Sequence, residues 1–161
     1  MPATDDILRS YRAPRAVMRD LLARGRSEPW VLTILLSALG VVFIAQWPRL
    51  SRLAHLEADQ PLTGLMVGTG LALVAVVPVF YLLAAGSHLV LRPLGGHGSF
   101  YGARLALFWA LLAVSPLMLL QGLVAGFIGP GVQMQAMSVL VGLAFLAIWF
   151  AALRVAEFEG K

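Results

Sequence analysis

The sequence predicts an all-α fold: a polytopic membrane bundle of four transmembrane helices with an N-terminal amphipathic helix. Of its 161 residues, 60% are hydrophobic and 12% are charged, and the mean hydropathy is +0.85. Soluble domains carry about 25% charged residues, so this chain has too little charge to cover a water-facing surface. Long uncharged runs alternate with short segments that hold the arginines, as in multi-pass membrane proteins. A water-soluble globular protein is therefore excluded.

The first transmembrane helix is predicted over 30–47, a run without charged residues. At 1.5 Å per residue this run covers about 27 Å, enough for the hydrocarbon core of a bilayer. Trp30 and Trp47 stand at its two ends, where indole rings favour the headgroup region. Pro48 is predicted to end the helix.

The second transmembrane helix is predicted over about 62–91, within an uncharged run that begins at residue 61. As one straight helix this run would reach about 45 Å, well beyond the roughly 30 Å hydrocarbon core. Pro78 lies inside the run and removes one backbone hydrogen bond. We therefore expect a kink at 75–78.

The third and fourth transmembrane helices are predicted from one stretch, 105–153, that carries no formal charge. A single crossing needs about 20 residues, so this stretch must fold back on itself. The sequence GFIGPG at 126–131 is its only strong group of helix breakers. A tight hairpin is expected there, between helices at about 105–125 and 133–153.

Four crossings place both chain ends on one side of the membrane, and the basic residues indicate which side. Ten of the twelve Lys and Arg residues fall on the side of the termini, in segments that are expected to face the cytoplasm. Eleven of the twelve are arginine, which is typical of a G+C-rich bacterial genome. A bacterial inner-membrane protein is therefore expected, with a cytoplasmic segment over 1–29, a transmembrane domain over 30–153 and a cytoplasmic tail over 154–161.

The N-terminal segment is predicted to form a cationic amphipathic helix. Apolar residues recur on one helical face and arginines gather on the opposite one, while Pro14 favours two pieces at about 4–12 and 14–24. Such a helix lies in the membrane interface with its apolar face in the lipid. The alternative is a solvated tail whose arginines only fix the topology. The residues expected to contact the lipid surface are Arg12, Arg15, Arg19 and Arg26.

The residue types that carry chemistry are scarce. There is no cysteine, no HExxH motif, no paired carboxylates and no serine–histidine–acid set. His55 is expected on the outer side and His97 on the inner side, so a shared metal site would have to cross the membrane. His88, near the inner end of a span, is interpreted as a neutral histidine bonded to nearby backbone or lying at headgroup level. The sequence therefore predicts no catalytic residue, metal site, cofactor or nucleic-acid partner.

The glycine-rich connection before the third helix is predicted to be a turn and a helix cap. It lacks the context of a phosphate-binding loop, because no β-strand is expected before it and no Gly-Lys-Ser/Thr follows. Its glycines allow a sharp reversal and its serine can cap the next helix. The residues assigned to this turn and cap are Gly95, Gly96, Gly98 and Ser99.

Two small-xxx-small steps are predicted to let helix backbones approach closely. Packing within the bundle is the plainer interpretation, and the face of a homodimer is the sharper alternative. The packing residues are Gly64, Gly68, Gly122 and Gly126.

Three stretches carry a resemblance to a known family. Ala13-Pro14-Arg15 opens the amphipathic segment, Gly95-Gly96-His97-Gly98-Ser99-Phe100 precedes the third span, and the span that follows contains a proline. Over residues 10–153 the chain is similar to bacterial members of the Yip1 family of small multi-span membrane proteins. The resemblance implies a helical bundle, a cytoplasmic N-terminus and a non-enzymatic membrane role. Four spans are predicted where five are usual, and the Asp-Leu-Tyr-Gly-Pro and Tyr-Gly-Tyr signatures of eukaryotic members are absent, so their GTPase binding is not transferred.

The function expected from these observations is that of a non-enzymatic integral inner-membrane protein of the Yip1 type, which organises membrane lipid or partner proteins. The alternative is an accessory subunit of a transporter or channel, motivated by His88 and by the glutamines near the hairpin. A lipid-modifying enzyme that uses His88, His97 and Ser99 is disfavoured, because no nucleophile and base are paired. The expected partners are membrane lipids, anionic ones in particular, and a second copy or another membrane protein.

Overall fold

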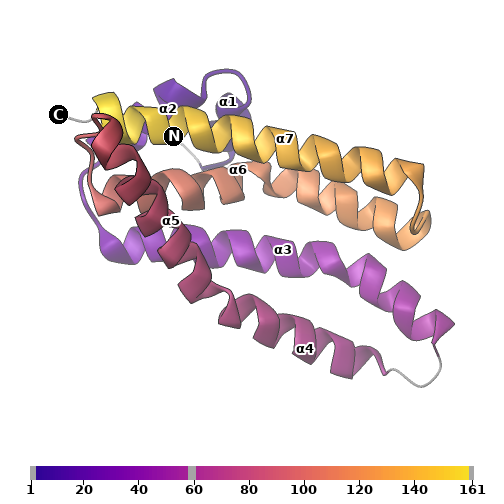
Figure 1. The fold of residues 1–161 in the computed structure, drawn as a ribbon. Coiled ribbons are helices and arrows are strands. Elements are labelled where there is room, and N and C mark those ends of the chain that lie inside the picture. Colours follow the sequence, from indigo (N-terminus) through magenta and orange to yellow (C-terminus); the bar gives the residue numbers. More distant parts are fainter. Residues whose placement is uncertain (1–2, 58–60, 160–161) are drawn as a thin grey trace.

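The computed structural model describes residues 3–57 and 61–159, and every regular element within them is a helix, which confirms the all-α prediction. Four helical stretches are long and apolar enough to cross a membrane, as a multi-pass integral membrane protein requires. Figure 1 shows both chain ends toward one end of the bundle. We call this end, where the second and fourth stretches finish, the termini end, and the opposite one the hairpin end. The four stretches are Glu28–Leu56, Leu62–Leu94, Phe100–Phe127 and Val132–Glu159.

Two short helices, α1 (Ala3–Ser10) and α2 (Pro14–Ala23), precede the bundle, with the break that Pro14 predicts. Val17, Met18 and Leu21, on the apolar stripe of α2, are completely buried in the protein core, and Leu22 packs against it. The expectation that this face lies in lipid is therefore wrong for α2. The helix instead contacts the last transmembrane stretch, Val132–Glu159.

The first transmembrane helix, α3 (Glu28–Leu56), continues through Pro48, so the prediction that proline ends it is wrong. A proline inside a helix removes one hydrogen bond, but membrane helices tolerate it where a neighbouring helix supports the backbone. Here Gly126 of the third transmembrane helix lies directly against Pro48. The missing side chain at Gly126 leaves the space that the proline-containing segment occupies.

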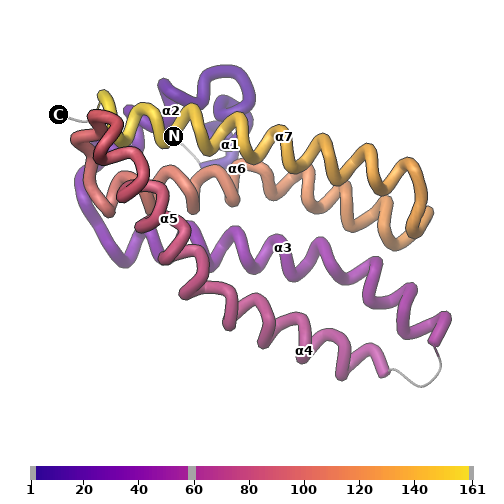
Figure 2. The backbone as a smooth tube through the Cα atoms, viewed as in Figure 1, coloured from indigo at the N-terminus to yellow at the C-terminus, as the bar shows by residue number. Residues whose placement is uncertain are grey.

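The second transmembrane stretch is broken into α4 (Leu62–Ala75) and α5 (Val77–Leu91), which confirms the kink predicted from Pro78. Figure 2 shows the backbone changing direction at this break, so that α4 runs beside α3 while α5 crosses toward the termini end. In α4, which the structure describes throughout, no residue is buried. A short 3₁₀ turn, Arg92–Leu94, then leads into the glycine linker.

The helix α6 (Phe100–Phe127) occupies the centre of the bundle and packs against α3, α5 and α7 (Figure 1). The predicted hairpin at 126–131 is confirmed, because α6 ends at Phe127 and α7 (Val132–Arg154) begins five residues later. A π-helical turn, η2 (Val155–Glu159), extends α7 into the predicted tail. Most of the buried core lies around the first half of α6, at the termini end.

Candidate functional site

A buried pair of ionisable side chains joins α5 to η2 at the termini end. His88 Nδ1 lies 2.8 Å from Glu157 Oε1 and 3.0 Å from Oε2. Glu157 is fully buried and His88 is only 6% exposed. The ring of Phe100 lies against the histidine, with 4.4 Å between the ring centroids. The interpretation of His88 as bonded to nearby backbone is therefore wrong, because its partner is a buried carboxylate. The alternative, that it lies at headgroup level, stays a prediction.

Glu157 lies in the π-helical turn η2, on the inward face of the last transmembrane helix. Leu153, four residues earlier, is also buried, and residues four apart share one face of a helix. Val155 and Ala156 beside Glu157 are buried as well. Single π turns are frequent at functional sites.

The glycine linker fits closely around Glu157. A methyl group added at Gly98 would lie 2.8 Å from Glu157 Oε2, and one at Gly96 would lie 3.1 Å from the same oxygen. The His97 backbone N–H donates to the Glu157 carbonyl oxygen at 2.8 Å. The glycines are therefore needed for close approach to the carboxylate as well as for the reversal of the chain.

The predicted turn and cap have the expected local geometry. Gly95 has φ 89°, a left-handed conformation that favours glycine. The Ser99 Oγ accepts a hydrogen bond from the Gly102 N–H at 3.2 Å and so caps α6.

The N-terminal helices are joined to one another by a second buried carboxylate. Asp6, which is 1% exposed, forms ion pairs with Arg24 at 2.7 Å and with Arg9 at 3.2 Å. They are fastened to α6 by neutral hydrogen bonds. The Trp109 indole N–H donates to Ser10 Oγ at 2.9 Å, and the Tyr11 hydroxyl donates to the Ala113 carbonyl at 2.8 Å.

The four arginines predicted to contact lipid all lie on the outside of these docked segments. Arg19 forms an ion pair with Glu159 at 2.8 Å. Arg12, Arg15 and Arg26 are exposed and make no hydrogen bond or ion pair within the described part of the chain. Arg26 also lines a small polar pocket with His97 and the linker. These four exposed arginines of the docked N-terminal segment, Arg12, Arg15, Arg19 and Arg26, are called the basic surface below.

The predicted packing glycines divide into two groups. Gly122 lies directly against Ala45 of α3, one turn before the contact between Gly126 and Pro48, so this step packs within the bundle. A methyl group at Gly64 would touch only Pro61 just before its own helix, at 3.7 Å. One at Gly68 would meet no described atom within 4 Å apart from its own helix backbone and chain neighbours. The α4 step therefore makes no comparable contact in the single chain.

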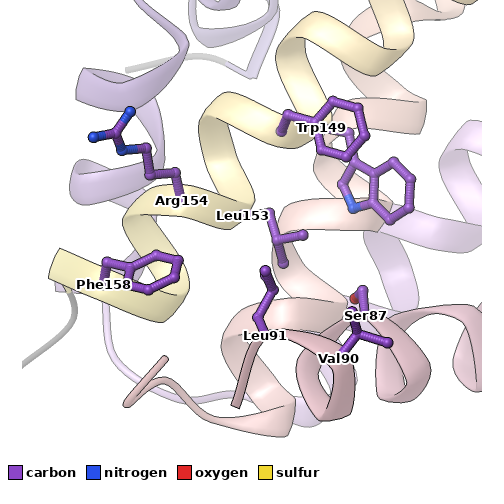
Figure 3. A pocket seen from close by; sticks show the side chains of 8 residues that line it. Ser87, Val90, Leu91, Trp149, Leu153, Arg154 and Phe158 are labelled. Atoms are coloured by element: carbon purple, nitrogen blue, oxygen red, sulfur yellow. The ribbon is translucent and has the colours of Figure 1, made fainter. Parts of the chain in front are cut away.

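A groove of about 540 Å³ lies between α5 and the end of α7 (Figure 3). Its walls are apolar, with Val90 on one side and Phe150 on the other, and Arg154 stands at its rim. The indole Nε1 of Trp149 is buried and has no hydrogen-bond partner among the described residues. Figure 3 shows this nitrogen on the side of the ring nearer Ser87.

The remaining polar side chains that the structure describes do not form a metal centre. His55 is exposed near the end of α3, at the hairpin end, and so lies far along the bundle from His88 and His97. Within residues 3–57 and 61–159, no group of three or more His, Asp and Glu side chains is placed to hold a metal ion.

Sequence reasoning missed Glu157, because the residue was assigned to the cytoplasmic tail over 154–161. The available signal was the apolar pair Val155-Ala156 just after Arg154, which indicates that the buried helix does not stop at residue 153.

Comparisons of the chain with protein families, with curated proteins and with solved structures found no match.

Proposed function

We propose that this protein is a non-enzymatic protein of the bacterial inner membrane, of the Yip1 type, that organises anionic lipid around its cytoplasmic end. The observation that carries the proposal is the basic surface on the docked α1–α2 segment. Positively charged residues near a membrane surface attract anionic lipid by about 1 kcal/mol each. In this proposal the N- and C-termini face the cytoplasm, where the positive-inside rule places most arginines.

The docking of α2 changes how lipid binding would work. Its apolar stripe packs against the rest of the protein, so the helix does not need to enter the bilayer to be stable. The segment instead presents fixed charges at the end of the spans. The buried ion pairs of Asp6 use Arg9 and Arg24, whereas Arg12 and Arg15 remain exposed to solvent or headgroups. The interaction is therefore electrostatic and should weaken as salt rises.

Lipid selectivity in a bilayer tests this proposal. The full chain is placed in vesicles of equal parts phosphatidylcholine and phosphatidylglycerol, and the association of spin-labelled forms of each lipid is measured. The wild type should prefer phosphatidylglycerol. Glutamine at all four positions of the basic surface should reduce the preference at least about fivefold, the effect of losing about 1 kcal/mol from a single charge near the surface. The control carries lysine at these positions and should retain the preference. An unchanged preference in the glutamine variant would refute the proposal.

A second candidate, an accessory subunit of a transporter or channel, is favoured by the buried pair of His88 and Glu157. Ionisable side chains within membrane proteins frequently mark ion or proton pathways. Among the glutamines near the hairpin, Gln121 donates a hydrogen bond from Nε2 to Ser138 Oγ at 2.9 Å. Proton flux in vesicles that contain the protein and its co-purifying partner should fall in His88→Ala, and flux unaffected by both His88→Ala and Gln121→Leu would count against this candidate.

A further inference from the structure

We propose that the groove between α5 and α7 binds one molecule of an anionic diacyl phospholipid. Its phosphate would lie at Arg154, an ester carbonyl at the indole N–H of Trp149, and an acyl chain along the apolar walls. This site is separate from the basic surface, although it rests on the same premise, that the protein binds membrane lipid.

The shape of the groove follows from the arrangement of three helices. Both α5 and α7 pack against α6, and side chains of both helices line the groove (Figure 3). The groove between them falls in the size range of sites for small ligands. Val90 is 65% exposed and Phe150 is 58% exposed, so both walls present apolar surface to an occupant.

The Trp149 indole provides a reason for the occupant to carry an acceptor. Buried N–H groups are almost always hydrogen-bonded, since an unpartnered one loses the bond that water would make. Ser87, the nearest hydroxyl in Figure 3, donates to the Ala84 carbonyl at 2.8 Å instead. An ester carbonyl in the groove would complete the hydrogen bonding of Trp149.

Arg154 provides the complementary charge at the rim. Its side chain makes no hydrogen bond or ion pair with any residue that the structure describes. The carboxylate of Glu159 is within electrostatic reach of Arg154 but is bonded to Arg19 at 2.8 Å. Arginine binds phosphate oxygens well because its planar group offers several donors. Arg154 and Trp149 are five residues apart, about 7.5 Å along the helix, with Arg154 nearer the termini end.

The combination of these groups favours a lipid over a partner helix. The groove offers a cation at Arg154, a hydrogen-bond donor at Trp149 and apolar walls that include Val90 and Phe150. A glycerophospholipid presents a phosphate, an ester carbonyl and a hydrocarbon chain, one for each of these features. A transmembrane helix has its backbone hydrogen bonds satisfied internally and offers no free carbonyl at that depth.

Quenching of tryptophan fluorescence by brominated acyl chains tests the site. Full-length protein in detergent micelles is titrated with dibromo-phosphatidylglycerol or dibromo-phosphatidylcholine, and the same titration of Trp149→Phe isolates the contribution of Trp149. We expect saturable quenching of Trp149, with phosphatidylglycerol saturating at the lower mole fraction. Arg154→Gln should raise the half-saturating amount of phosphatidylglycerol about fivefold, as expected for one basic residue. Ether-linked phosphatidylglycerol, which lacks the ester carbonyls, should compete less well than the ester lipid.

Two control variants separate this site from other possibilities. Val90→Phe fills the groove without removing a charge and should abolish the saturable component, whereas Arg15→Gln removes a charge from the basic surface and should leave it unchanged. Quenching that rises without saturation, or that is equal in the wild type and Arg154→Gln, would overturn the inference. A disulfide between one copy that carries only Val90→Cys and another copy that carries only Phe150→Cys would also overturn it, because it would place a second copy in the groove. Failure of the proposed function would appear differently, as unchanged lipid selectivity in the glutamine variant of the basic surface.

Discussion

The two ends of the bundle are held together by different interactions. At the termini end, buried polar groups connect segments that are distant in sequence, with Asp6 inside the N-terminal segment and His88 bonded to Glu157 across the bundle. At the hairpin end, α3 and α6 meet through glycine contacts, and α4 has no fully buried residue. Buried polar groups are costly when a partner is lost, whereas helix packing in lipid depends on close approach of backbones. The termini end should therefore be sensitive to the loss of partners and the hairpin end to added volume.

The largest effect should come from separating His88 and Glu157. His88→Leu leaves a buried carboxylate without its partner, which typically costs about 3–5 kcal/mol. Unfolding of the full chain in mixed micelles, titrated with a denaturing detergent, measures this loss. The double variant His88→Leu/Glu157→Leu should recover much of it, because both ionisable groups are then gone. The control is His97→Leu, at an exposed histidine, which should change the free energy of unfolding little. An equally small change in His88→Leu would contradict the role of the pair.

The next effect should come from adding a side chain between α3 and α6. Gly122→Leu pushes new atoms into the backbone of Ala45, and overpacking of this kind costs about 1–3 kcal/mol or more. Gly68→Leu is the matched control on α4, where the added group meets open space, and it should change the free energy of unfolding little. Equal losses in the two variants would show that the hairpin end is not held at the α3–α6 contact.

A smaller effect is expected at Asp6. Asp6→Asn weakens the ion pairs to Arg24 and Arg9, whose guanidinium groups are partly exposed, so the cost should be about 1 kcal/mol. Loosening of α1 and α2 should appear as faster amide hydrogen exchange in both helices, with α3 unchanged. Asp5→Asn, a change at the adjacent exposed acid, should leave exchange as in the wild type. Equal exchange rates in Asp6→Asn and Asp5→Asn would show that Asp6 does not hold the N-terminal segment in place.

The smallest effect concerns Tyr11 and depends on pH. Burial raises the pKa of the Tyr11 phenol, and its hydroxyl donates to the Ala113 carbonyl. Because the pKa is raised on folding, the stabilisation from the protonated phenol is complete below about pH 10 and is lost as the pH rises further. Tyr11→Phe should be less stable by about 1 kcal/mol near neutral pH, and the difference should shrink above pH 10. A constant difference across this range would contradict the assignment.

The transmembrane spans could be read from sequence because each depends on local composition. The lengths of the uncharged runs and the positions of helix-breaking residues predict the kink before Pro78, the hairpin at 126–131 and the break before Pro14, and all three are found. The cap at Ser99 likewise needs only its own helix. Each of these features is decided within a few residues of chain, and so each was predictable.

The features that could not be predicted depend on tertiary neighbours. Periodicity shows that α2 has an apolar face but not whether lipid or protein covers it, and here protein covers it. Pro48 remains helical because a glycine on α6 faces it, which hydropathy cannot indicate. The partnership of His88 with Glu157 joins residues 69 positions apart, and no sequence motif marks it.

The most direct test of the account is to map which side of the membrane each end of the bundle faces. The chain has no cysteine, so single substitutions can be labelled without background. Asp5→Cys and Phe158→Cys should react with an impermeant thiol reagent from the cytoplasmic face of inverted vesicles, and His55→Cys should react from the opposite face. Labelling of Asp5→Cys and Phe158→Cys from different faces, or of Asp5→Cys and His55→Cys from the same face, would contradict four crossings with a basic cytoplasmic end.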